Sequence, residues 1–233
     1  MELNVSSVFF HLPAKRLFRS LAVMLPVVVL PLSASASGLH LLDDFYLNDK
    51  AEDIRSLPGA FDCSDLYSGK LTYCFDQLRV FDVDEELLAV FVVEQKAHSV
   101  EYTTPLNAAS YNTVLAGLRR KGLVFAHLNV NDETLDVLAG IQHLDRQTLD
   151  EQMFVLANRY DFTVPREYLF LDKGAFNRAY RQGEQNIEQW LTAGDSTDEQ
   201  KKYDRTVIMS VSAEQITVTV SYPFVGTGTG IDD

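Results

Sequence analysis

The chain has 233 residues, of which 46% are hydrophobic and 23% charged, enough apolar sequence for one ample domain or two small ones. Its formal net charge of −13 repels phosphate backbones and anionic lipid, so nucleic acids and membrane surfaces are not expected partners. A cationic protein, a divalent cation or a simple need for solubility is compatible with this charge.

The first 36 residues have the features of a secretory signal peptide. Cations, an apolar run and small residues follow one another at Lys15, Arg16 and Arg19, at Leu21 to Leu32, and at Ala34-Ser35-Ala36. The apolar run is shorter than the ~20 residues of a spanning helix, and Pro26 and Pro31 interrupt it. We predict cleavage after Ala36 and a periplasmic or secreted product, with a retained membrane anchor as the alternative.

The only cysteines are Cys63 and Cys74. In an exported chain this pair predicts a disulfide that closes a short loop. The spacing is not Cys-x-x-Cys, and no histidines cluster nearby, so neither a redox motif nor a zinc site is expected. We predict no metal and no cofactor for this chain.

After the leader, residues 48–57 predict a short helix that ends at Pro58-Gly59. Beyond the cysteine loop, the apolar runs Leu78 to Val83 and Leu87 to Val93 flank an acidic turn and predict a first hairpin. Both faces of the second run are apolar, so we expect this hairpin to lie mid-sheet and to be covered on both sides.

A helix and a second hairpin follow. Thr104-Pro105 predicts the helix start, and Arg119-Arg120-Lys121-Gly122 predicts its end. The second hairpin is expected from Leu123 to Val130 and from Thr134 to Ile141, with its turn at Asn131-Asp132-Glu133.

The rest of the chain predicts two helices, a strand and a third hairpin. The first helix is expected from Asp145 to Arg159, and a short strand follows at Tyr168 to Leu171. The second helix is expected as one element from Asp172 to Ala193, with Trp190 in the core. The third hairpin, Thr206 to Ser212 and Gln215 to Tyr222, alternates most regularly, with Ser210, Thr217 and Thr219 facing outward.

Together these elements predict an α+β fold in which an antiparallel sheet of about three β-hairpins has helices packed on it. The hairpins share an apolar-acidic-apolar pattern, which suggests repeated helix-hairpin units. We expect a first half at residues 37–143 with the disulfide loop, a second half at 144–223, and a flexible tail at 224–233.

Chemical signatures are sparse. The motifs of common serine hydrolases, P-loop enzymes and zinc proteases are absent from the sequence after the leader, so no catalytic residue is predicted. The acidic turn at Asp82, Asp84 and Glu86 is expected to be solvated, because it lacks the later ligands of a calcium loop. Three aromatic residues around the cysteine loop form a candidate binding patch or a shield for the disulfide: Tyr67, Tyr73 and Phe75.

The sequence therefore favours an exported, non-catalytic protein that binds a protein or a small ligand of the cell envelope through the sheet face or the cysteine loop. One alternative is an envelope hydrolase that acts on a glycan or an ester through Asp, Glu or His side chains. The other is a structural subunit of an envelope assembly.

Overall fold

The computed structural model describes residues 39–161, 164–192 and 199–225. Residues Ser37–Asp233 belong to one compact unit. The predicted leader, its cleavage site and most of the predicted tail lie outside the described residues.

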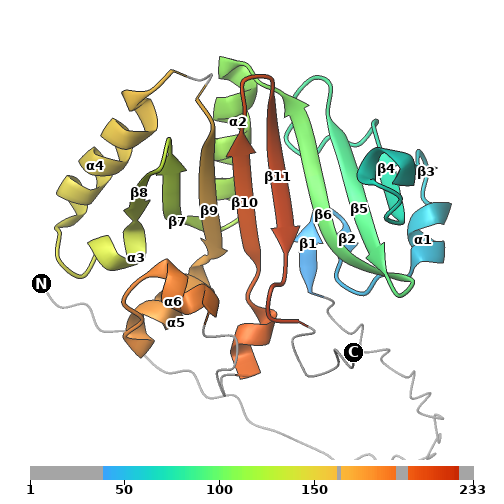
Figure 1. The fold of residues 1–233 in the computed structure, drawn as a ribbon. Coiled ribbons are helices and arrows are strands. Elements are labelled where there is room, and N and C mark those ends of the chain that lie inside the picture. The colour runs from blue at the N-terminus through green and yellow to red at the C-terminus, as the bar shows by residue number, and fades with distance from the viewer. Residues whose placement is uncertain (1–38, 162–163, 193–198, 226–233) are drawn as a thin grey trace, which may run out of the picture. The chain divides into compact units, whose positions relative to one another are not determined.

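The fold is α+β, as the sequence predicted, and its centre is a nine-stranded antiparallel sheet (Figure 1). The strands in sheet order are β3 (Phe61–Asp62), β4 (Thr72–Phe75), β5 (Leu87–Val93), β6 (Lys96–Pro105), β11 (Gln215–Ser221), β10 (Thr206–Val211), β9 (Arg166–Asp172), β7 (Leu123–Val130) and β8 (Glu133–Asp136). A separate hairpin is formed by β1 (His40–Leu42) and β2 (Phe45–Tyr46). The helices are α1 (Ala51–Ser56), α2 (Ala108–Arg120), α3 (Val137–Gly140), α4 (Arg146–Arg159), α5 (Lys173–Gln182) and α6 (Ile187–Thr192), with 3-10 turns at Ser64–Tyr67 and Glu199–Tyr203.

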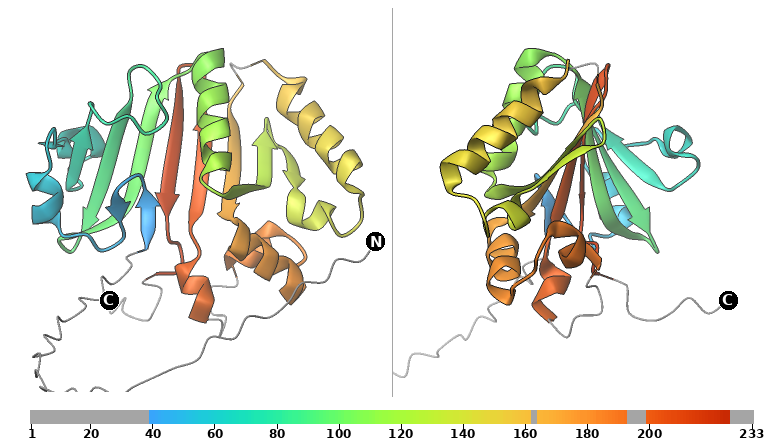
Figure 2. Two further views of the ribbon diagram at one scale, coloured as in Figure 1. Left: turned by 180° about the vertical axis from the view of Figure 1, so that it is seen from behind. Right: turned by 60° about the vertical axis from the view of Figure 1, so that its left-hand side comes forward.

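One face of the sheet carries the main hydrophobic core. Alternate residues of β10 and β11, such as Met209 and Val218, are fully buried and belong to one cluster with Val114 and Leu118 of α2 and Leu156 of α4. Figure 2 shows α2 on this rear face, running along the strands. We call it the helix-covered face.

The predicted halves of the chain interleave in this sheet. β9, β10 and β11 lie between β6 and β7, so strands from residues 144–223 are inserted between strands from residues 37–143. Both halves therefore contribute to one continuous sheet.

The first predicted hairpin is wrong in its first strand and its turn. Residues 78–83 are not a strand, because the carboxylate of Glu86 holds their backbone N–H groups in a loop. The hairpin is instead β5–β6, with its turn at Glu94 and Gln95, where φ is 49° and 63°. β5 is largely buried on both sides as expected but is third from the β3 edge, and the middle strand is β11.

The helix predictions needed two corrections. β6 continues through Pro105, which pairs with Gln215, so α2 begins later, behind a capping box of Asn107 and Ser110. The long helix predicted from Asp172 is two helices, because Gly183 has φ of 80° and ends α5 in the left-handed conformation.

The other predicted elements are confirmed. These are α1, which begins at Ala51 rather than at residue 48, α4, β9, the second and third hairpins, Gly122 after α2, and Trp190 in the core. The second strand of the second hairpin is shorter than predicted, because Asp136 caps α3. Cys63 and Cys74 form the expected disulfide.

Candidate functional site

The face of the sheet opposite the main core exposes a band of polar side chains. We call this band the polar sheet face: Ser99, Glu101 and Thr103 of β6, Gln215, Thr217 and Thr219 of β11, Ser210 of β10, Glu167 of β9 and Asn129 of β7. All of these side chains are half-buried or exposed, and buried core residues separate them along each strand. The sheet is thus covered on one side and polar in the middle of the other.

Strand register places five of these residues in one row. Asn129 lies opposite Glu167, Glu167 opposite Ser210, Ser210 opposite Thr217, and Thr217 opposite Thr103. Directly paired residues of an antiparallel sheet stand on the same face, with strands ~4.8 Å apart. The row therefore presents a continuous polar surface about 19 Å wide.

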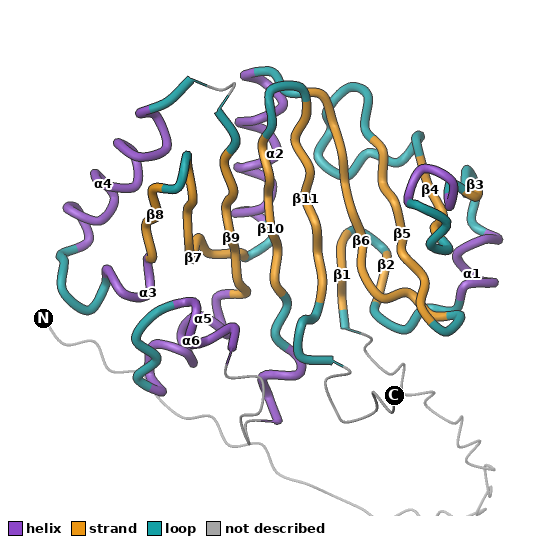
Figure 3. The backbone as a smooth tube through the Cα atoms, viewed as in Figure 1, coloured by secondary structure: helices purple, strands orange, loops and turns teal. Residues whose placement is uncertain are grey.

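Two covered regions flank the polar sheet face. On one side, Ala175, Ile187 and Trp190 of α5 and α6 pack on Leu169 and Leu171 of β9. Figure 3 shows these helices at the lower end of the strands, whereas no helix crosses the front of β10 and β11. The polar sheet face lies in the opening between the flanks.

The disulfide loop forms the other flank. The ring of Tyr67 stands edge-on to the ring of Phe91 on β5, with ring centroids 4.8 Å apart and an interplanar angle of 84°. Beneath it, Cys63 and Cys74 pack with Ala89. Burial, together with the nearby carboxylate of Glu101, raises the pKa of Tyr67 to about 12. Tyr67 therefore borders the polar sheet face as a neutral phenol at neutral pH.

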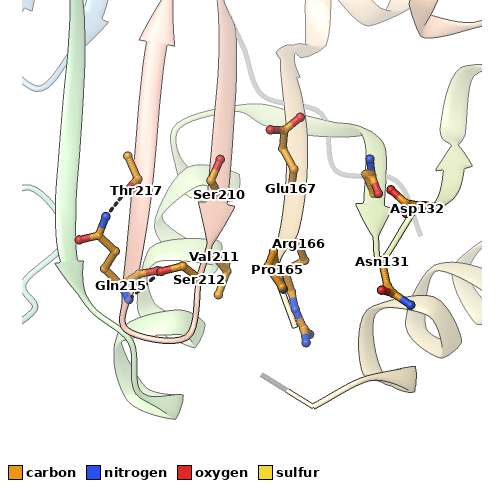
Figure 4. A pocket seen from close by; sticks show the side chains of 11 residues that line it. Asn131, Asp132, Pro165, Arg166, Glu167, Ser210, Val211, Ser212, Gln215 and Thr217 are labelled. Atoms are coloured by element: carbon orange, nitrogen blue, oxygen red, sulfur yellow. Dashed lines mark hydrogen bonds between the residues drawn. The ribbon is translucent and has the colours of Figure 1, made fainter. Parts of the chain in front are cut away.

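A shallow depression of about 520 Å³ lies at the end of the polar sheet face nearest β7 (Figure 4). Its lining includes Asn129, Glu167, Ser210, Gln215 and Thr217 of the polar sheet face, and Asn131 and Asp132 of the β7–β8 turn. The Gln215 side-chain amide donates a hydrogen bond to the hydroxyl of Thr217 at 3.4 Å. Amide, hydroxyl and carboxylate groups here offer both donors and acceptors to a ligand.

Arg166 fixes the rim of this depression. The side chain is buried, and its guanidinium donates hydrogen bonds to the carbonyl oxygens of Ala157 at 2.8 Å, Tyr160 at 3.1 Å and Asp161 at 2.6 Å. These bonds tie the connection between α4 and β9 to the start of β9. The buried guanidinium of Arg166 therefore fixes this rim, and the exposed polar side chains of the depression remain available to a ligand.

The polar sheet face is acidic. Glu101 and Glu167 belong to it, Asp132 lies at its edge, and its members include no lysine and no arginine. None of the ion pairs found among the described residues involves any of these three carboxylates. The surface is therefore suited to cationic and hydrogen-bonding groups.

The three aromatic residues predicted as a patch do not share one surface. Tyr73 and Phe75 point into the core of the helix-covered face, where the rings of Phe75 and Phe45 lie 5.1 Å apart. Tyr67 alone lies on the side of the polar sheet face, against Phe91. A partner on the surface can reach only Tyr67.

The carboxylates of the acidic turn, Asp82, Asp84 and Glu86, do not all face solvent. Asp82 and Asp84 are exposed, as predicted. The side chain of Glu86 is buried and binds backbone N–H groups, so the prediction that it faces solvent is wrong. Among the described residues no group of three His, Cys, Asp or Glu side chains is arranged to hold a metal ion. Across the same residues, every helix is too short or too polar to cross a bilayer.

No protein-family model, curated protein or solved structure was found to match this chain. Function is therefore inferred from its own side chains and their geometry.

Part of the polar sheet face was visible in the sequence. The outward Ser and Thr residues of β10 and β11 were predicted, whereas Glu101, Thr103 and Glu167 were missed. The available signal for β6 was the alternation of Ser99, Glu101 and Thr103 with Val100, Tyr102 and Thr104. The hairpin predicted at residues 78–93 concealed it, because it paired β5 with the wrong segment and left residues 96–103 without a predicted element.

Proposed function

We propose that this chain is an exported, non-catalytic binding protein that holds a second protein on its polar sheet face. The observation that carries this proposal is the five-strand row from Asn129 to Thr103, which leaves polar groups on an uncovered face while the opposite face forms the core. A surface of this width matches the flat contact that proteins make with one another.

The arrangement of the polar groups supports binding rather than catalysis. The depression is broad and open to solvent. Within the described structure, neither Ser210 nor Thr217 donates a hydrogen bond to a histidine or a carboxylate, which is the pairing that activates a hydroxyl nucleophile. A row of groups spaced by the strands can instead make many parallel hydrogen bonds to one partner.

The acidic charge of the protein favours a basic partner, and its disulfide fits a partner outside the cytoplasm. The carboxylates of Glu101 and Glu167 and the net charge of −13 favour a partner with a basic surface. The Cys63–Cys74 disulfide is compatible with an oxidising compartment, which fits the predicted leader. The partner is accordingly sought in the cell envelope.

The test is affinity capture from an envelope fraction with three forms of the protein. The Ser210→Arg/Thr217→Arg variant places two long cations at the centre of the polar sheet face, and the Gln147→Arg/Asn158→Arg variant places the same charges on exposed positions of α4. We expect the partner to be retained by the wild type and the α4 variant and to bind the face variant at least about tenfold more weakly. Equal retention by the face variant, with unchanged circular dichroism, would refute the proposal.

A further inference from the structure

The sheet ends at an open edge. β8 pairs with β7 on one side, and no other described strand lies beside it. An edge strand presents unpaired backbone N–H and C=O groups, which another extended chain can pair with. β8 is therefore a template for a further strand.

A groove of about 500 Å³ runs beside this edge, between β8 and α4. On the strand side it is lined by Glu133, Thr134 and Leu135, three consecutive residues. Consecutive side chains of a strand point to opposite faces of the sheet, so only space alongside the backbone can touch all three. The groove therefore runs along the open edge of β8, and α4 forms its other wall.

The helix side of the groove is long enough for a short extended segment. Its lining residues recur at helical spacing along one side of α4: Thr148, Glu151, Gln152, Val155, Leu156 and Arg159. At 1.5 Å per residue this stretch is about 17 Å long. An extended chain of five residues, at ~3.3 Å per residue, has the same length.

The chemistry changes along the groove. Its middle is apolar, with Leu135 on the strand and Val155 on the helix, the latter 51% exposed. One end is closed by the ion pair of Arg159 and Glu133, which Tyr160 joins through its hydroxyl. Toward the other end lies the exposed carboxylate of Glu151, which accepts a hydrogen bond from the Gln147 amide at 2.9 Å.

We propose that this groove binds an extended segment of a second protein, which adds as a strand beside β8. Backbone hydrogen bonds to β8 supply general affinity, an apolar side chain packs between Leu135 and Val155, and a basic side chain lies near Glu151. The site is separate from the polar sheet face and does not depend on the function proposed for that face. Self-pairing of two copies centred on Thr134 is disfavoured, because it sets Asp132 opposite Asp136 of the other copy.

The test uses a synthetic decapeptide of alternating valine and lysine as the probe. Its control is the same peptide with N-methyl groups on alternate backbone amides, which keeps the side chains and removes the donors of a strand. The protein variants are Val155→Lys, inside the groove, and Phe154→Lys, the neighbouring residue, which is 69% exposed and outside it. Binding is measured by fluorescence anisotropy, and amide hydrogen exchange of β8 by mass spectrometry.

We expect the unmethylated peptide to bind and to slow amide exchange in residues 133–136. N-methylation and Val155→Lys should each weaken binding about tenfold or more, while Phe154→Lys stays within about twofold. The Ser210→Arg/Thr217→Arg variant should bind the peptide like the wild type, which separates this site from the polar sheet face.

Several results would overturn the proposal. Equal binding of the methylated peptide would mean that charge alone attracts the probe, and absence of binding would mean that the edge accepts no strand of this chemistry. Unchanged binding by Val155→Lys would place the peptide elsewhere. Self-association of the protein that Val155→Lys abolishes would identify a second copy as the occupant instead.

Discussion

The buried carboxylate of Glu86 accepts a hydrogen bond from the backbone N–H of Val80 at 2.8 Å. The same carboxylate accepts bonds from the N–H groups of Phe81 at 3.3 Å and Val83 at 2.5 Å. One side chain thus organises the connection between β4 and β5. The loop in turn places the ring of Phe81 edge-on to Tyr102 in the core, 4.8 Å between centroids.

Removal of this carboxylate should destabilise the protein strongly. In Glu86→Ala, the buried N–H groups of Val80 and Phe81 and the half-buried N–H group of Val83 lose their acceptor, and we expect the free energy of unfolding to fall by about 3 kcal/mol. Urea denaturation followed by circular dichroism measures the change. Asp84→Ala, an exposed carboxylate in the same loop, is the control and should stay within about 0.5 kcal/mol of the wild type. Similar losses in both variants would contradict this role of Glu86.

The disulfide should contribute stability by restricting the unfolded chain. Its cysteines are separated by 11 residues, and for a loop of this size the entropic contribution is ~3 kcal/mol. Cys63→Ser/Cys74→Ser should therefore lower the urea midpoint, and dithiothreitol should lower the midpoint of the wild type but not that of the variant. A reductant effect on the variant would show that the loss has another source.

Tyr67 should titrate late in alkali. Burial and the Glu101 carboxylate raise its pKa to about 12, so the difference in phenolate absorbance between wild type and Tyr67→Phe should develop near that pH. Glu101→Gln should move this titration to lower pH but leave it above the ordinary value, because burial is the larger cause. Titration near pH 10 in the wild type would mean that the ring is not packed against Phe91.

Alkaline stability follows from the same shifts. The pKa values of Tyr67 and Tyr222 are each raised to about 12, so the folded state keeps protons that the unfolded state releases from about pH 10. The free energy of unfolding should therefore fall as the pH rises from about 10 to about 12. Urea denaturation at several alkaline pH values measures this slope, and Tyr67→Phe should reduce it.

The glycine inside α5 and the glycine that ends it should respond to alanine in opposite directions. Gly183 has φ of 80°, so Gly183→Ala forces a side chain into the left-handed conformation and should cost about 1 kcal/mol. Gly174 lies in the first turn, where an added methyl group meets only the end of the Arg178 side chain at 3.5 Å. Gly174→Ala should stabilise by about 0.5 kcal/mol. Thermal unfolding of both variants measures these changes. A stabilising effect of Gly183→Ala would contradict the break at Gly183 and would mean that α5 and α6 form one continuous helix.

Local patterns were sufficient for most elements. The alternation of Met209 and Val211 with Ser210 and Ser212 predicted β10, and the Asn131-Asp132 turn predicted the second hairpin, where both residues have positive φ. These features depend on neighbours in the sequence. The outward Ser and Thr residues of β10 and β11 were predicted for the same reason.

The order of the strands and the roles of the buried polar groups could not be predicted from local patterns. The run Leu78 to Val83 is as apolar as a strand, yet a carboxylate at Glu86 takes its backbone donors. The insertion of β11 beside β6 depends on pairing between distant segments, which no periodicity encodes. The row from Asn129 to Thr103 is therefore a property of the assembled sheet, and so is the groove between β8 and α4.

The pairing of β6 with β11 also joins strands that lie far apart in the chain. Pro105 pairs with Gln215. The sheet of β3, β4, β5 and β6 therefore continues only through β11, the last strand of the chain. Such distant pairing makes closure of the sheet slow. During synthesis or translocation from the N-terminus, the sheet cannot close before Ser221 has emerged. A chain exported as proposed would thus complete its sheet only after Ser221 has crossed the membrane.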